Sequence, residues 1–216
     1  MATASRKRRA AARIAPDAGT RDKILAAALI AFADAGFDGA TTRDIAAAAG
    51  VNQGLITYHF AGKEALWKAA VDFVFDELRA SFASAVDMFA AVDARTRLRL
   101  MIRRFVTFSA AHPELHRLIV QEGKSDGPRL RWLVDRHVRP LFEASLAVVR
   151  GAQADGVLSH LPAVHLQYIV LGAAAHLFVV APEFQRLTGN DPTSPESVEA
   201  HVVTLTELLL GREETR

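Results

Sequence analysis

The sequence predicts an all-α protein of about nine helices, and three observations support this fold class. Apolar residues recur at spacings of three and four positions along most of the chain, as in the stripe that begins at Ile24 and Leu25. Glycine and proline residues stand between these stripes, where helices end and begin. No segment shows the regular alternation of apolar and polar residues that indicates a strand. We therefore expect a small helical head followed by a larger helical body.

The head begins with a helix that ends at Gly36, and residues 41–67 then predict two short helices, a tight turn between them and the start of another helix. Thr41 and Asp44 have the spacing of a capping box, Gly50 provides the permissive backbone of the turn, and Asn52 suits the N-cap of the second short helix. Gly54 lets the backbone of that helix approach a partner closely. This pattern is a helix-turn-helix, which indicates double-stranded DNA as the partner. The residues expected in its core are Ile45, Leu55, Ile56 and Phe60.

The same stretch resembles the DNA-binding domain of the TetR family of bacterial repressors. The matching motifs are T-x-R-x-I-A-x-x-A-G-V from Thr41, Y-H-F from Tyr58 and G-K-E-x-L from Gly62, within about residues 20–67. The resemblance implies that Thr42 contacts a phosphate and that Arg43 approaches a base edge, where arginine can bond guanine. Thr57 stands where many members of the family carry an aromatic residue. In the second short helix, the resemblance implies base contacts for Asn52, Gln53 and Thr57 and phosphate contacts for Tyr58 and His59, and it implies a further phosphate contact for Lys63 in the motif that follows.

Charge is concentrated at the N-terminal end. The formal net charge of the 216 residues is only +2, but residues 1–65 hold nine Lys or Arg against six Asp or Glu. Five of these basic residues lie in residues 1–18, which show no apolar periodicity, so we expect a disordered basic arm there. Such an arm either adds salt-dependent affinity for DNA or only keeps the terminus soluble.

Cysteine is absent, which excludes disulfides, thiolate catalysis and zinc held by cysteine. The N-terminal residues lack the apolar segment of a secretory signal, and no apolar run approaches the ~20 residues that span a membrane. We therefore expect a cytoplasmic protein with no membrane partner.

Beyond the head, the chain predicts six more helices. The first of them is long, with an apolar stripe that continues to Val86 and Phe89, and it can link head and body. The helix from Pro128 toward Ala154 should bend at Pro140, because proline lacks a backbone donor. The six helices begin near Gly62, Asp93, Pro113, Pro128, Pro162 and Ser194.

The last two predicted helices indicate a dimer. The helix from Pro162 is almost wholly apolar or small between Leu166 and Phe178, so one covered face does not account for it. The last helix carries a further apolar stripe that includes Val202 and Leu208. We expect these two helices of each protomer to form a four-helix bundle about a twofold axis, as the resemblance also implies; burial within one chain is the alternative. Such a homodimer would bind a palindromic operator whose half-sites lie about one helical turn, ~34 Å, or a multiple of it apart.

The body needs a role besides reading bases, and the resemblance implies that it holds a small-molecule effector whose binding releases a repressor from DNA. Aromatic or polar residues on otherwise apolar helices are candidates for that chamber, and each is also explained as ordinary core. They indicate a largely apolar effector with a few hydrogen-bonding groups, of unknown identity. The candidates are Phe105, Phe108, Trp132, His137, Phe142, Gln167 and His176.

We expect no cofactor and no enzymatic activity. His112 and His116 have the spacing that lets two imidazoles share a metal ion, but no third ligand is indicated. Paired Glu-x-x-His motifs, a nucleophile elbow, a P-loop and a dinucleotide fingerprint are all missing from the sequence. The alternatives are an architectural DNA-binding protein without an effector and, less favoured, a helical metal-dependent enzyme. The predicted division is a basic arm over 1–18, a helix-turn-helix domain over 19–65, and an effector-binding and dimerisation domain over 66–212.

Overall fold

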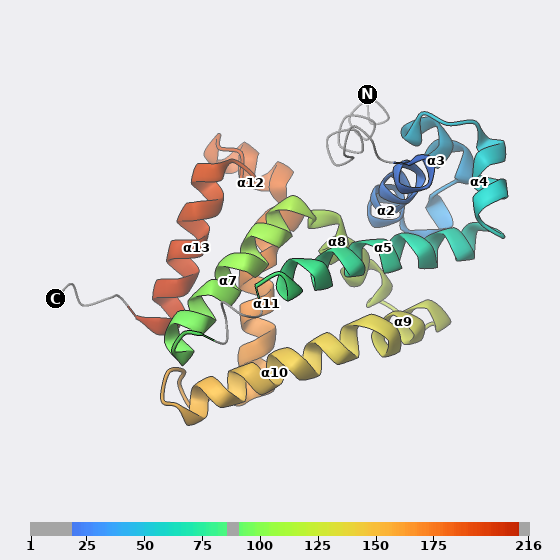
Figure 1. The fold of residues 1–216 in the computed structure, drawn as a ribbon. Coiled ribbons are helices and arrows are strands. Elements are labelled where there is room, and N and C mark those ends of the chain that lie inside the picture. Colours follow the sequence, from blue (N-terminus) through green and yellow to red (C-terminus); the bar gives the residue numbers. More distant parts are fainter. Residues whose placement is uncertain (1–18, 86–90, 212–216) are drawn as a thin grey trace. The chain divides into compact units, whose positions relative to one another are not determined.

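The structure, a computed structural model, describes residues 19–85 and 91–211, and every regular element in these two ranges is a helix (Figure 1). The predicted all-α class is confirmed. The predicted arm over 1–18, the stripe positions Val86 and Phe89, and residue 212 lie outside the described residues. The helices are α2 (Thr20–Gly39), α3 (Thr42–Ala49), α4 (Gln53–His59), α5 (Lys63–Ala83), α7 (Ala94–Ala111), α8 (Pro113–Glu122), α9 (Pro128–Leu133), the π-helix η1 (Val134–Val138), α10 (Arg139–Ala154), α11 (Ala163–Val179), α12 (Ala181–Thr188) and α13 (Pro195–Leu210).

These helices form two compact units. Within the described ranges, the first unit comprises residues 19–77 and 114–130, and the second comprises 78–85, 91–113 and 131–211. The helix-turn-helix therefore shares a unit with α8, a helix from the middle of the chain. The predicted boundary between residues 65 and 66 stays a prediction.

In the first unit, α2 packs on α3 and α3 packs on α4. All ten residues of the segment 24–33 in α2 are buried, on every side of the helix and not only on the predicted stripe. Five of them are alanines, whose small side chains let neighbouring backbones come close. Gly36 has φ +70° and ψ 175°, which breaks the helical path before a short continuation to Gly39. The regular helix therefore stops at Gly36, as predicted, and a short helical segment follows the kink.

In the second unit, α7 packs against α11 and α13, and α10 packs against α11. Two polar contacts join α7 to α13. The Arg103 guanidinium pairs with the Glu199 carboxylate, with Nη2 2.7 Å from Oε1. Arg95 donates to the carbonyl of Leu210, which lies among the helix's last carbonyls, the ones without a partner inside the helix. The apolar core of this unit consists of Leu98, Ile102, Val106, Val149, Ala152, Leu158, Leu166, Ala174, Phe178, Val202, Leu205 and Leu210.

Two elements differ from the predicted helices. The segment from Pro128 to Ala154 is not one bent α-helix, because the π-helix η1 separates α9 from α10. Pro140 offers no backbone donor to the carbonyl four residues earlier, and the preceding turn widens so that Arg139 N–H donates to the Val134 carbonyl. Helix α12 was not predicted; Gly189, with φ +75°, closes it.

No single helix in the described ranges has the length and apolar character needed to cross a membrane. Helices α11 and α12, bent by 70° at their junction, meet that test only when taken together.

Candidate nucleic-acid interface and effector region

The turn between α3 and α4 has the hydrogen bonds that the sequence predicts. Thr41 Oγ1 accepts from the Asp44 N–H at 3.1 Å, which caps α3, and the Asp44 carboxylate accepts from the Thr41 hydroxyl at 2.7 Å instead of from the Thr41 backbone N–H of a full capping box. Gly50 adopts φ +70° and closes α3, where L side chains are strained. Asn52 Oδ1 accepts from the Gly54 N–H at 2.8 Å and caps α4. The predicted helix-turn-helix is confirmed as a local structure.

The inner face of this motif is closed by three apolar side chains. Ile45, Ile56 and Phe60 are all buried, as predicted. Leu55, which was also expected in the core, is 38% exposed, and that expectation is wrong. Each residue turns a helix by about 100°, so Leu55 points to a different side of α4 from Ile56, and that side is only partly covered.

The outward face of the motif carries the residues predicted to contact DNA. Arg43, Asn52, Gln53 and Thr57 are exposed, Tyr58 is 81% exposed, and Thr42, His59 and Lys63 are half-buried. Gln53 Nε2 donates to Thr42 Oγ1 at 3.3 Å, which joins the start of α4 to the start of α3. The rings of Tyr58 and His59 meet edge to face, with centroids 5.1 Å apart. The structure thus brings all eight predicted residues into one small motif; their individual roles stay predictions.

Lys63 is held by the end of α2. Its ammonium donates to the Asp38 carbonyl at 3.3 Å and lies 4.8 Å from the centre of the Phe37 ring. The guanidinium of Arg129 lies 4.1 Å from the same ring, so Phe37 interacts with two cations. Lysine has three donor hydrogens, so these contacts still leave it able to bind a phosphate.

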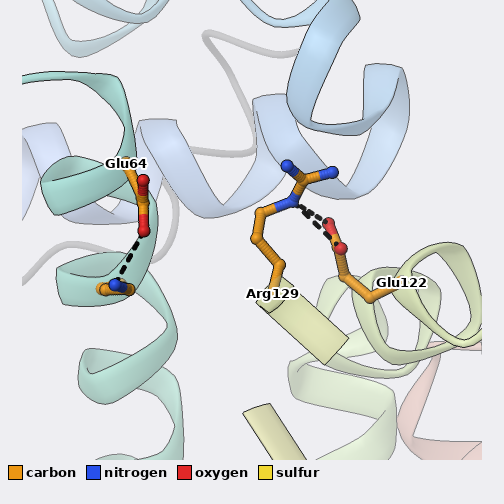
Figure 2. A network of polar contacts seen from close by, with 4 residues as sticks. Glu64, Glu122 and Arg129 are labelled. Atoms are coloured by element: carbon orange, nitrogen blue, oxygen red, sulfur yellow. Dashed lines mark hydrogen bonds and ion pairs between the residues drawn. The ribbon is translucent and has the colours of Figure 1, made fainter. Parts of the chain in front are cut away.

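Acidic side chains balance some of this positive charge inside the first unit. Figure 2 shows Arg129 reaching the carboxylate of Glu122, with Nε 3.1 Å and 3.3 Å from its two oxygens. Glu64 pairs with Lys68 at 2.7 Å. The hydrogen bond and charge of Lys68, and after them the charge of Arg129, lower the pKa of Glu64. No sequence pattern singled out Arg129, because Phe37 is distant along the chain and Glu122 belongs to a different helix.

The residues predicted to line an effector chamber differ in how deeply they are buried. Phe108, His137 and Gln167 are buried, Phe105, Trp132 and Phe142 are half-buried, and His176 is exposed. Trp132 and His137 contact each other edge to face at 5.4 Å, and Gln167 bonds the carbonyl of Phe142 at 3.1 Å. Phe108 instead stacks on His112 at 4.2 Å. All seven belong to the second unit, and their contact with an effector stays a prediction.

His137 lies in the π-helix with a fixed tautomer. Its Nδ1 is 3.2 Å from Nη1 of Arg79, and a guanidinium can only donate. Nδ1 therefore accepts, and the ring proton is on Nε2. A π-helix inside an α-helix is frequent at functional sites, because the extra residue redirects the side chains that follow. Arg79 was not among the predicted residues.

Gln167 contains an acceptor that the protein leaves unused. Its Nε2 donates to the Phe142 carbonyl and to Ser145 Oγ at 2.6 Å. The amide cannot be turned over, because its oxygen would then face the Phe142 carbonyl. In this orientation Oε1 is buried, and no donor among the described residues reaches it. A buried acceptor without a partner costs about 1–3 kcal/mol, which a water or a ligand donor would offset.

A metal centre has no support from the geometry of the described residues. Within residues 19–85 and 91–211, no three side chains of His, Cys, Asp or Glu lie close enough together to hold an ion. His116, one of the two histidines considered for such a site, has its pKa lowered by burial to about 4.

Two family models match the chain. The model for bacterial regulatory proteins of the tetR family matches residues 24–70, and the model for the tetracyclin repressor-like C-terminal domain matches residues 95–208. The chain belongs to the TetR family. This TetR-family chain is a transcriptional regulator with a helix-turn-helix, as the motifs of its head predicted. The second match covers more than half of the sequence and extends the family relationship to the body.

Individual proteins agree with this assignment. The HTH-type transcriptional repressor SCO4008 of Streptomyces coelicolor is 30% identical over 170 residues, which cover 78% of this chain and 82% of that protein. The HTH-type transcriptional regulator RutR of Escherichia coli K12 is 28% identical over 166 residues, 77% of each protein. The crystal structure of AibR in complex with isovaleryl coenzyme A and operator DNA shares the fold, with a TM-score of 0.69 and 15% identity over 89% of this chain and 99% of that one.

Proposed function

We propose that this TetR-family regulator is a homodimeric repressor that binds a palindromic operator and leaves it when a small molecule binds to its second unit. The observation that carries the proposal is the exposed polar face of α3 and α4, built on a capped and buried helix-turn-helix. Exposed apolar side chains on α11 and α13 support the dimer, and the unused acceptor of Gln167 supports the effector.

The polar face divides into two kinds of contact. Arg43 at the start of α3, together with Asn52, Gln53 and Thr57 of the recognition helix α4 and its N-cap, is exposed, and these side chains would meet base edges. The second group, Thr42, Tyr58, His59 and Lys63, would bind phosphates and fix the register of the helix in the groove. The bond between Gln53 and Thr42 would restrain Gln53 before DNA arrives.

The dimer is supported by apolar side chains left in contact with water. Along α11, Val164, Tyr168, Gly172 and His176 are exposed at intervals of four residues, which places them along one side of the helix. A Cβ added to Gly172 would meet nothing within 4 Å, so a second helix can come close there. Neighbouring Ile169 is 61% exposed, and on α13 Val203 and Leu208 are 44% and 76% exposed. Exposed apolar surface of this kind marks an interface, here with a second copy. His176 would then lie in the interface.

The effector is supported by the unused acceptor of Gln167 and by the π-helix that carries His137. AibR, which shares this fold, was crystallised with isovaleryl coenzyme A and operator DNA together. An effector that fits the second unit better in one arrangement of the dimer would shift the population away from the DNA-bound arrangement. The size of that shift is limited by the difference between the effector's affinities for the two arrangements.

Selection of bound sequences from random duplex DNA tests the proposal. The purified protein should enrich one palindrome, and Arg43→Ala should weaken binding to it by at least about fivefold per half-site, because one arginine–guanine contact contributes about 1–3 kcal/mol. Tyr58→Ala should also weaken it, and the matched control Arg150→Ala, an exposed arginine of the second unit, should not. Recovery of no motif, with binding that only fades as salt rises, would contradict the proposal and favour an architectural DNA-binding protein.

A further inference from the structure

Leu55 is an apolar side chain in an unexpected place. It is 38% exposed on α4, directly before Ile56, which is 3% exposed. With about 100° per residue and Ile56 at the centre of the buried face, Gly54 and Tyr58 lie near the middle of the outward face. Leu55 lies about 60° from Tyr58 on one flank of that face. The matching family motifs do not include this position.

The two flanks of α4 differ in chemistry. Gln53 and Thr57 share the flank that faces the start of α3, since Gln53 bonds Thr42 there. The opposite flank presents the branched, apolar side chain of Leu55. Between the flanks, Gly54 has no side chain, so the backbone of α4 can come close to the floor of a groove.

We propose that Leu55 packs against the C5-methyl group of a thymine and so sets the base preferred at one position of each operator half-site. This inference rests on the proposed binding of DNA by α4. Thymine is the one standard base that presents a methyl group in the major groove, and apolar side chains contact it. Burying Leu55 against a methyl removes two apolar surfaces from water, which explains why an exposed leucine is tolerated on this helix. Cytosine at the same position presents an amino group there, which leucine cannot bond.

Replacement of thymine by deoxyuridine tests this contact, because it removes the methyl group and keeps every hydrogen-bonding group. Each thymine of the selected operator is replaced in turn, in both half-sites, and the dissociation constant is measured with the full-length protein. Replacement at one symmetric pair of thymines should weaken binding by about fourfold per half-site, which corresponds to one buried methyl group, and by roughly fifteenfold when both half-sites are replaced. Leu55→Ala should bind the thymine and deoxyuridine operators equally at that pair.

A matched variant and the salt dependence isolate the contribution of Leu55 from that of its neighbours. Thr57→Ser removes a methyl group from the opposite flank and should keep the preference for thymine at the Leu55 position. Leu55→Ala should leave the slope of log K against log salt unchanged, since leucine touches no phosphate, whereas Lys63→Ala should reduce it.

The outcomes separate this inference from the proposed function. If a palindrome is recovered, but Leu55→Ala responds to every replacement of thymine by deoxyuridine as the unchanged protein does, the role of Leu55 is overturned and sequence-specific binding stands. Failure to enrich any palindrome would overturn both. Loss of the methyl effect in Thr57→Ser but not in Leu55→Ala would assign the contact to the other flank.

Discussion

The helix-turn-helix and the second unit of this regulator differ in the side chains that they expose and bury. In the helix-turn-helix of the first unit, apolar residues such as Ile45 and Ile56 are buried and polar residues such as Arg43 and Gln53 face the solvent. The second unit buries the polar side chains of His137, Gln153 and Gln167, and α11 and α13 expose Tyr168, Ile169 and Leu208. The difference indicates two kinds of partner. A polar surface suits DNA, and an apolar surface above buried polar groups suits a second protomer and a small molecule.

The largest effect is expected from a substitution that disrupts the exposed apolar surface of the second unit. Ile169→Asp places a charge where the proposed interface is dry, so we expect the dimer to dissociate into monomers in sedimentation measurements. Operator affinity should fall by at least about a hundredfold, because the two helix-turn-helix motifs are then no longer linked and each binds its half-site independently. Leu187→Asp is the control, since Leu187 is 79% exposed on α12, outside the proposed bundle. Dissociation by both variants, or by neither, would contradict the assignment of the interface to α11 and α13.

The buried amides of the second unit provide a smaller effect. Gln153 Nε2 donates to the carbonyls of Ser159 and Leu161, both at 2.7 Å, in the loop between α10 and α11. Gln153→Leu leaves these loop carbonyls without that donor and should cost about 1–3 kcal/mol in urea unfolding. Gln167→Leu should cost less than about 1 kcal/mol, because it also removes the unused Oε1. An equal cost for both would show that Oε1 has a partner and would remove the support for an effector at Gln167.

The last effect depends on pH and concerns the titratable side chain of His116 in the first unit. Burial lowers the pKa of His116 in α8 from 6.5 to about 4, so the unfolded chain binds more protons than the folded one between these values. Its contribution to stability is therefore complete above pH 6.5 and is lost as the pH falls toward 4. We expect a decrease of up to about 2 kcal/mol between pH 7.5 and pH 5, measured by urea unfolding. His116→Leu should remove this part of the decrease; an unchanged pH profile would mean that His116 is accessible to protons in the folded state.

The helix-turn-helix was predictable because its determinants are local. The N-cap at Thr41, the left-handed Gly50 and the cap at Asn52 each act within four residues, and each is present in the structure. The same locality explains the confirmed helix starts at Pro113 and Pro128. Leu55 was wrongly placed in the core, because adjacent apolar residues in a helix point about 100° apart and the sequence does not show which of the two faces the neighbouring helices.

The candidate site in the second unit depended on contacts between distant residues. Among seven polar or aromatic candidates, the sequence could not distinguish Gln167, which is buried with an unused oxygen, from His176, which is exposed. Their difference depends on which helices pack against α11. The partners Arg79 of His137 and Ser145 of Gln167 lie 58 and 22 residues away along the chain.

By itself, the sequence determined the all-α class, helix starts such as those at Pro113 and Pro128, and the helix-turn-helix, because helical periodicity, caps and glycine conformations act over one or two turns. The tertiary structure decided which side chains of each helix are covered. It exposed Leu55 on the recognition helix and Ile169 on α11, surrounded Phe37 with Lys63 and Arg129, and buried Gln167. Burial is a property of neighbouring helices, so the exposure of Leu55 and Ile169 and the burial of Gln167 could be established only after those helices were in place.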